Sequence, residues 1–299
     1  MNPQNSGRSA RTAVQLVVLG LVLLVGLNYQ ALLDQYALAT FHPGAGMAAI
    51  EPRLDLTQPA KAALYRSKAQ IDSKTSFNQD CETKPHELEL GCFFHGRIYV
   101  LQIDNENLAP EMDVVTSHEL LHAVWANMSS QDKKTLGAEL EKEYSRVAND
   151  DLRQRMAGYA QSEPGEQDNE LHSILGTEFA DLSPTLERHY AKYFANRSVI
   201  VAAHAQYESV FSSRRTELET ELSQIRAEKA QLAVLNRQLE SYKAAGQVDT
   251  YNSLVPQQNR MVDQINTEIA GYRQGVDEYN ALSKSLDSQE ITDTETSAQ

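Results

Sequence analysis

The last third of the chain restricts the fold most, because its apolar residues recur at alternating spacings of three and four. Such spacing is typical of coiled-coil helices. Two seams show it: Leu218, Leu222, Ile225, Leu232, Leu235, Leu239 and Tyr242, interrupted by Lys229; and Val262, Ile265, Ile269, Tyr272, Val276 and Tyr279, continuing to Leu286. The connection between them is short and contains Gly246 and Pro256. We therefore predict an antiparallel coiled-coil hairpin over residues 205–288, followed by a disordered tail, 289–299.

The N-terminus carries a second constraint, an apolar segment without charge. Arg11 and Asp34 enclose 22 uncharged residues, close to the ~20 that a helix needs to cross a bilayer. Arg8 and Arg11 precede the segment, so the positive-inside rule keeps residues 1–12 in the cytoplasm. We predict a single-pass membrane anchor over 13–33, a juxtamembrane linker over 34–60, and an extracytoplasmic remainder. The alternative is a signal peptide cleaved after Ala37-Leu38-Ala39, which would release a secreted protein.

Charge and cysteine content exclude several classes of protein. With 41 acidic against 27 basic residues the formal charge is −14, which argues against nucleic acid as a partner. Cys81 and Cys92 are too few for a disulfide scaffold or a four-cysteine zinc site, so a metal would need histidine and carboxylate ligands. Outside the cytoplasm the two cysteines can form a disulfide; the alternative is two buried thiols.

Between these regions the pattern predicts a mainly helical domain with a small β-hairpin, an α+β fold, over residues 61–204. The strands ELELGCFF and GRIYVLQI flank a turn at His95-Gly96, and the second is rich in β-branched and aromatic residues. Helices are predicted over residues 61–79, 110–128, 131–160, 168–180 and 184–204.

The sequence His118-Glu119-Leu120-Leu121-His122 lies inside one of these predicted helices and matches H-E-x-x-H. Histidines four residues apart project from one helix face and can bind one tetrahedral metal ion, for which we expect a single Zn²⁺ per chain. Glu119 lies about 100° round the helix, where it can act as general base toward a metal-bound water. The alternative is a chance match on an ordinary amphipathic helix.

A catalytic zinc site needs a third protein ligand, and two glutamates downstream are candidates. The stretch Asn169-Glu170-Leu171-His172-Ser173 resembles the Asn-Glu-x-x-Ser pattern of the gluzincin metallopeptidases, which implies Glu170 as the ligand. The chain departs from the thermolysin-like form at Ile174, where that form has an aspartate. Glu178 with Asp181 stays open as the alternative, because it resembles the Glu-then-Asp arrangement of membrane-associated zinc peptidases.

The resemblance covers about residues 87–204 and implies further roles. In zincins the strand before the active-site helix commonly pairs with the substrate backbone, which would give that role to residues 97–103; a plain internal strand is the alternative. The same enzymes use histidine or tyrosine donors to the oxyanion of the tetrahedral intermediate. The candidates here are His172, His189, Tyr190 and Tyr193.

The sequence thus favours a membrane-anchored zinc metalloendopeptidase that hydrolyses peptide bonds in extracytoplasmic proteins. Two other functions stay open: a non-catalytic anchored coiled-coil protein with a remnant metal site, and a zinc hydrolase acting on a non-peptide bond. The hairpin is either a structural arm or a docking surface for a protein partner or a second copy of the chain.

Overall fold

The computed structural model describes residues 28–81 and 89–287, which divide into two compact units. The first unit contains residues up to 102 and 111–204, and the second contains 103–110 and the residues from 205 onward. The predicted anchor lies outside the described residues, apart from positions 28–33. In the described part of the chain, no helix combines the length and apolar character needed to span a membrane.

The segment predicted as a juxtamembrane linker is folded, so that prediction was wrong. It forms α2 (Tyr29–Thr40), α3 (Ala45–Ile50) and a 3₁₀ turn (Glu51–Arg53). Side chains from this segment are buried in the core of the first unit, namely Ala37, Met47, Ile50 and Leu54. Two prolines of this segment lie at helix starts: Pro52 opens the 3₁₀ turn and Pro59 lies in the first turn of α4 (Gln58–Arg66).

The next predicted helix, 61–79, is in fact divided into three elements. After α4 the chain forms β1 (Gln70–Asp72) and then α5 (Lys74–Asp80). Lys68 adopts a φ of 47°, a left-handed conformation that ends α4 and turns the chain into the strand.

The predicted β-hairpin is confirmed. Strands β2 (Gly91–Phe94) and β3 (Arg97–Leu101) pair in antiparallel fashion, and β1 pairs with β3 in parallel, giving the order β1-β3-β2. The turn residues His95 and Gly96 both have positive φ, 48° and 77°, as a two-residue hairpin turn requires. Alternate β3 side chains separate two cores: Ile98 and Val100 join the main one, whereas Tyr99 and Leu101 pack near the Cys81–Cys92 disulfide.

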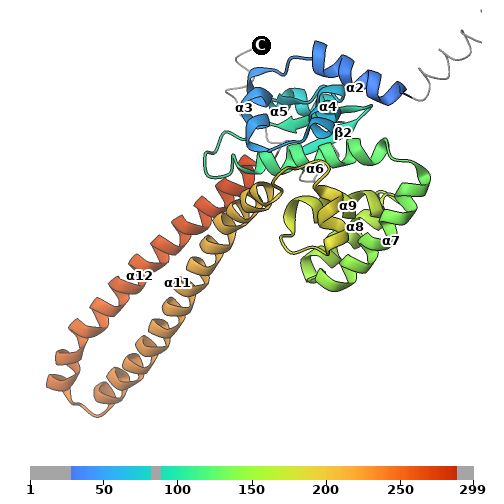
Figure 1. The fold of residues 1–299 in the computed structure, drawn as a ribbon. Coiled ribbons are helices and arrows are strands. Elements are labelled where there is room, and N and C mark those ends of the chain that lie inside the picture. Colours follow the sequence, from blue (N-terminus) through green and yellow to red (C-terminus); the bar gives the residue numbers. More distant parts are fainter. Residues whose placement is uncertain (1–27, 82–88, 288–299) are drawn as a thin grey trace, which may run out of the picture. The chain divides into compact units, whose positions relative to one another are not determined.

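Five helices complete the first unit (Figure 1): α6 (Glu111–Ala126), α7 (Ser130–Val147), α8 (Asp150–Ser162), α9 (Gln167–Glu178) and α10 (Pro184–Tyr190). The predicted helix at 131–160 is two helices, because the Asn149 side chain accepts a hydrogen bond from the Leu152 N–H at 2.8 Å and starts α8. The predicted helix at 184–204 is likewise broken, since α10 ends at Tyr190 and α11 begins at Ser198.

The second unit contains the predicted helical hairpin, formed by α11 (Ser198–Ala244) and α12 (Val248–Ser285), which run antiparallel in Figure 1. Side chains pair across the hairpin in antiparallel register: Arg214 with Glu278, Gln224 with Glu268, and Asn236 with Gln258. The turn is tighter than predicted, with Gly246 at a φ of 69°, and Pro256 lies inside α12. The packing of α12 against α11 on either side of Pro256 therefore stabilises the helix by more than the loss of one backbone hydrogen bond destabilises it.

Candidate metal centre

Helices α6 and α9 pack closely at the HELLH sequence. The cause is Gly176, where a Cβ atom would lie 2.5 Å from Leu121 Cδ1 and 2.7 Å from Tyr190 Cε1. Both helices are buried along most of their length, so the side chains between them are shielded from water. This close approach brings the first turn of α9 alongside His118 and His122.

The histidines and the glutamate of HELLH form one compact group. Ligand atoms of His118, Glu119 and His122 all lie within 4.8 Å of one another. Glu119 and His122 are buried, and His118 is partly exposed. Among the residues that the structure describes, this is the one such group of histidines and acids that could hold a metal ion.

Glu170 approaches both histidines from α9. Its Oε1 lies 3.4 Å from His122 Nε2, and its Oε2 lies 3.7 Å from His118 Nε2. Two imidazole nitrogens and one carboxylate therefore face a common point, which is a donor set suited to a transition-metal ion.

Asn169 fixes the tautomer of one histidine. Its Oδ1 lies 2.9 Å from His122 Nδ1, while its Nδ2 donates to Glu166 Oε2 at 3.1 Å. Because the amide nitrogen is used by Glu166, the amide oxygen must accept, so His122 donates from Nδ1 and keeps the Nε2 lone pair. A hydrogen bond at the outer nitrogen is typical of metal-binding histidines.

The electrostatics of the group favour a cation. Burial raises the pKa of Glu119 to about 8, and the Glu170 charge adds to that rise. Burial opposes protonation of His118, but the nearby Glu170 carboxylate and the charge of Glu119 outweigh it and raise the pKa of His118. Burial and the neighbouring His118 lower the pKa of His122. The two carboxylates thus stabilise positive charge between the histidines, as a metal site requires.

Glu178, the alternative third ligand, has other partners. Arg155 of α8 donates to both of its oxygens, from Nη1 to Oε1 at 2.9 Å and from Nη2 to Oε2 at 2.5 Å. His204 Nε2 lies 3.6 Å from Glu178 Oε2. Burial opposes ionisation of Glu178, but the Arg155 contact outweighs it and holds the pKa below its usual value.

The four predicted oxyanion donors cluster with one another. His172 and His189 share a hydrogen bond between their Nε2 atoms at 2.9 Å, and the Tyr190 hydroxyl donates to the His172 carbonyl at 2.8 Å. Tyr193 packs its ring edge against His189, with centroids 5.4 Å apart. His172 follows Glu170 by two residues, about 200° round α9, so its ring lies away from the Glu170 carboxylate. In this arrangement the polar contacts of His172, His189 and Tyr190 hold α9 against α10.

The strand next to the site is β2 rather than the predicted 97–103. Strand β3 lies between β1 and β2, so its backbone groups are already paired; among the described strands, β1 and β2 are the two edges, and β2 is the one that contacts Glu119. At Gly91 a Cβ atom would lie 3.0 Å from Glu119 Cγ and would collide with Val115 Cγ1. The edge strand therefore touches the proposed base, and only glycine allows this approach.

Two residues near the group were not singled out from the sequence. Tyr159 of α8 is affected by the charges of Glu170 and Glu119, and burial raises its pKa. Arg155 lies on the same helix and faces Glu178. No local pattern marks either residue, because α8 reaches the site only through tertiary packing.

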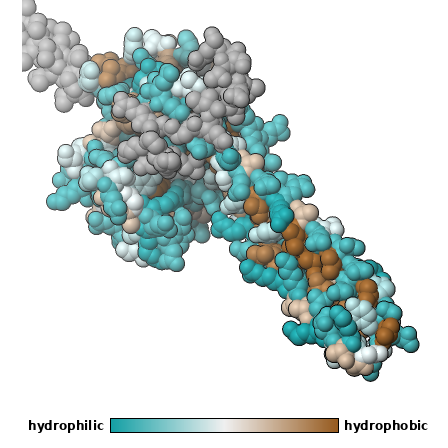
Figure 2. Space-filling view, turned by 180° about the vertical axis from the view of Figure 1, so that it is seen from behind, coloured by the Kyte–Doolittle hydropathy of each residue, from teal (hydrophilic) through white to brown (hydrophobic). Residues whose placement is uncertain are grey.

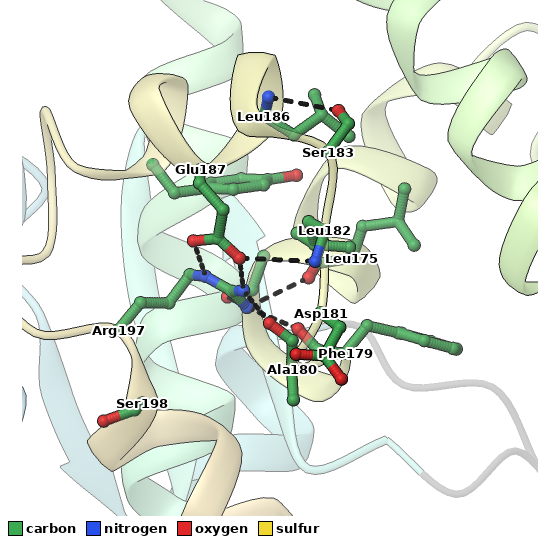
Figure 3. A network of polar contacts seen from close by, with 12 residues as sticks. Leu175, Phe179, Ala180, Asp181, Leu182, Ser183, Leu186, Glu187, Arg197 and Ser198 are labelled. Carbon is green, nitrogen blue, oxygen red and sulfur yellow. Dashed lines mark hydrogen bonds and ion pairs between the residues drawn. The ribbon is translucent and has the colours of Figure 1, made fainter.

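Arg197 supports the helix that carries Glu170 (Figure 3). It is buried and donates to the carbonyls at the C-terminal end of α9, including those of Phe179 at 2.6 Å and Ala180 at 2.8 Å. Glu187 of α10 pairs with the same guanidinium. The last carbonyls of a helix have no partner within the helix, and a cation there also stabilises the helix dipole.

No family model matches the chain, and no curated protein or solved structure was found that is similar to it. A function must therefore be argued from the chemistry of the site. Two histidines with a carboxylate, a second carboxylate beside them, and an adjacent strand edge form a set that can bind a metal ion and place a base next to it.

Proposed function

We propose that the chain is a zinc-dependent metallopeptidase in which His118, His122 and Glu170 hold the metal. The observation that carries this proposal is the approach of Glu170 to both Nε2 atoms, at 3.4 and 3.7 Å, on a helix separate from HELLH. If the H-E-x-x-H match were due to chance, we would not expect a carboxylate from another helix to lie beside both histidine Nε2 atoms. Mixed nitrogen and oxygen donors, three in number, are the set of catalytic zinc sites that leave one position open.

Glu170 rather than Glu178 is the proposed third ligand. Glu178 would have to leave the bidentate contact with Arg155 of α8 in order to reach the histidines. Glu170 already faces the histidines, and the preceding residue, Asn169, orients His122. Neighbouring positions on α9 thus supply the proposed ligand Glu170 and the Asn169 side chain, which orients His122.

The proposed chemistry follows from the positions of the surrounding side chains. Zinc at this site would lower the pKa of a bound water and polarise a carbonyl. Glu119, buried beside the two histidines, would accept the proton of that water and pass it to the leaving amine. Tyr159 of α8 keeps its proton, because burial and the charge of Glu170 raise its pKa.

The proposed substrate is an extended polypeptide. β2 is the edge strand beside Glu119, so its backbone groups can pair with a peptide lying along the site. The Cys81–Cys92 disulfide supports a compartment outside the cytoplasm, because such bonds persist in oxidising environments. We therefore retain the proposal of an N-terminal anchor with the catalytic unit in an extracytoplasmic location.

Metal analysis combined with a peptide-library digest tests this function. The purified protein should contain one zinc ion, and chelation should abolish cleavage until zinc is restored. Glu119→Gln should keep the metal and reduce kcat by at least about 100-fold, the usual contribution of a general base. Glu141→Gln is the control, because Glu141 is an exposed glutamate on α7. The enzymatic proposal fails if Glu119→Gln cleaves as fast as the parent, or if the protein binds no transition metal.

A further inference from the structure

Helix α12 has an apolar row beside its contact with α11, and α11 covers this row only in part. Contacts with α11 are made by Gln258, Glu268, Gly275 and Tyr279, and Ile265 between them is buried; these positions follow one another at spacings of three, four or seven. Val262, Ile269 and Val276, predicted as seam residues, lie one position to the side, and Val262 is 36% exposed. With Val255 they form a row that repeats every seven residues.

Hydrophobic side chains accordingly gather in a band along the hairpin on the face that Figure 2 shows. A two-stranded coiled coil needs two apolar positions per heptad, whereas a helix in a larger bundle uses three. The apolar face of α12 therefore has the width of a bundle helix.

The corresponding row on α11 is basic. It consists of Arg215, Leu222, Lys229, Asn236 and Lys243, which also repeat every seven residues. In an antiparallel pair these two rows lie on the same side of the hairpin. The opposite side is closed by polar contacts, in which Gln224 and Gln264 both donate to Glu228 and Glu268.

A hollow lies on this side of the hairpin, between the α11 row and two tyrosines of α12. Its volume is about 250 Å³, and it is lined by Arg215, Leu218, Glu219, Leu222, Tyr272 and Tyr279. It forms where Gly275 lets α12 approach Leu218, so that the tyrosines two turns apart leave a space between them. Such a space is of the kind that receives one apolar side chain of a neighbouring helix.

Charge indicates what would occupy this side of the hairpin. The two rows contain three basic residues, Arg215, Lys229 and Lys243, and no acidic residue, although acidic side chains outnumber basic ones 41 to 27 in the whole chain. A second hairpin joined symmetrically by this face would bring the same basic rows together. An occupant with acidic residues along one flank would instead pair with them.

We propose that the groove between these two rows binds an amphipathic α-helix of another protein, with an apolar stripe against the Val255–Val276 row and acidic residues against Arg215 and Lys229. The hollow takes one large apolar side chain of that helix. This binding mode does not depend on the proposed peptidase activity, and it would bring a partner or substrate protein to the chain.

The test uses the full-length protein in detergent and a fluorescent synthetic helix roughly four heptads long, with leucine at the seam positions and glutamate on the flanks. Fluorescence anisotropy should show saturable binding, and a peptide with lysine in place of glutamate should bind at least about tenfold more weakly. Val262→Glu should weaken binding of the acidic peptide by a similar factor, because it places a like charge in the apolar row.

Val234→Glu is the matched control. Val234 is also on the hairpin and is more exposed, at 46%, but it lies outside both rows. Its substitution should leave the affinity within about twofold, and circular dichroism should show equal helix content in both variants. The proposal is overturned if the acidic peptide does not bind, if the lysine peptide binds equally well, or if both valine variants weaken binding alike. Sedimentation of the chain alone that shows a dimer broken by Val262→Glu would assign the groove to a second copy and also overturn it.

Discussion

At the scale of single residues, the site depends on two glycines, which have no side chain, as much as on the residues that carry chemistry. Gly91 and Gly176 each lie where a Cβ atom would meet a neighbouring side chain, Gly91 beside Glu119 and Gly176 beside Leu121. Side chains at these two positions would push β2 or α9 away from α6. The position of Glu119 and the distances from Glu170 to the histidines therefore depend on two residues that have no side chain.

Gly91→Ala should lower kcat by about tenfold or more while the zinc content stays at one per chain, because displacement of Glu119 misplaces the base but not the ligands. Steady-state kinetics and metal analysis of the same preparation measure both quantities. Gly158→Ala is the control, since a Cβ at Gly158 of α8 meets no atom within 4 Å. Unchanged kcat in Gly91→Ala would show that β2 does not set the position of Glu119.

The third ligand can be identified by comparing two glutamine variants. Glu170→Gln should weaken zinc binding by well over about 100-fold, whereas Glu178→Gln, which keeps a hydrogen-bond acceptor for Arg155, should weaken it by no more than about that factor. Competition with a zinc chelator of known affinity measures both, after circular dichroism shows that each variant is folded. The opposite ranking would move the ligand to Glu178.

At the scale of elements, local sequence patterns correctly predicted those helices and turns whose contacts are local. The hairpin turn at His95-Gly96, the helix carrying HELLH and the two long C-terminal helices follow from turn chemistry and periodicity. The linker prediction was wrong because the segment contains short helices, and its Pro52 and Pro59 lie at helix starts. The α12 seam was assigned one position off at Val262, since apolar residues occupy three positions per heptad and the sequence does not show which of them α11 covers.

Periodicity also could not reveal which distant groups stabilise α9. Arg197 lies in the connection between α10 and α11, yet it binds carbonyls at the end of α9. Tyr159 and Arg155 approach the site in the same way, through packing of α8. The sequence thus predicted the residues within HELLH and its Asn169-Glu170 neighbour, but not the groups that reach them from other helices.

Arg197→Met should destabilise the first unit by about 2–4 kcal/mol, because it leaves buried carbonyls of α9 without a donor and removes the partner of Glu187. Urea unfolding followed by tryptophan fluorescence reports on this unit, since Trp125 is on α6. Arg188→Met serves for comparison, as Arg188 is exposed on α10 and should change stability by less than about 0.5 kcal/mol. Equal effects of the two substitutions would mean that Arg197 does not stabilise α9.

At the scale of the whole molecule, acidic residues dominate the charge, but stability at mildly acidic pH depends on buried histidines. His172 and His189 are held neutral in the folded chain: burial lowers the pKa of His189 to about 4 and that of His172 well below its usual value. In the unfolded chain both titrate near ~6.5. Between pH 6.5 and 4 the unfolded chain therefore binds more protons than the folded chain.

This difference determines whether the free energy of unfolding rises or falls with pH. Where the unfolded state binds more protons, the free energy of unfolding rises with pH, so stability should fall steadily as the pH is lowered from about 6.5 toward 4. Urea unfolding at a series of pH values measures this slope through Trp125 fluorescence. His189→Gln retains a hydrogen-bond donor for His172 but cannot take up a proton, so its stability should decline less steeply over the same interval. If the variant and the parent show the same slope, protonation of the His172–His189 pair does not limit stability, and the buried carboxylates around Arg155 and His118 would have to account for any loss.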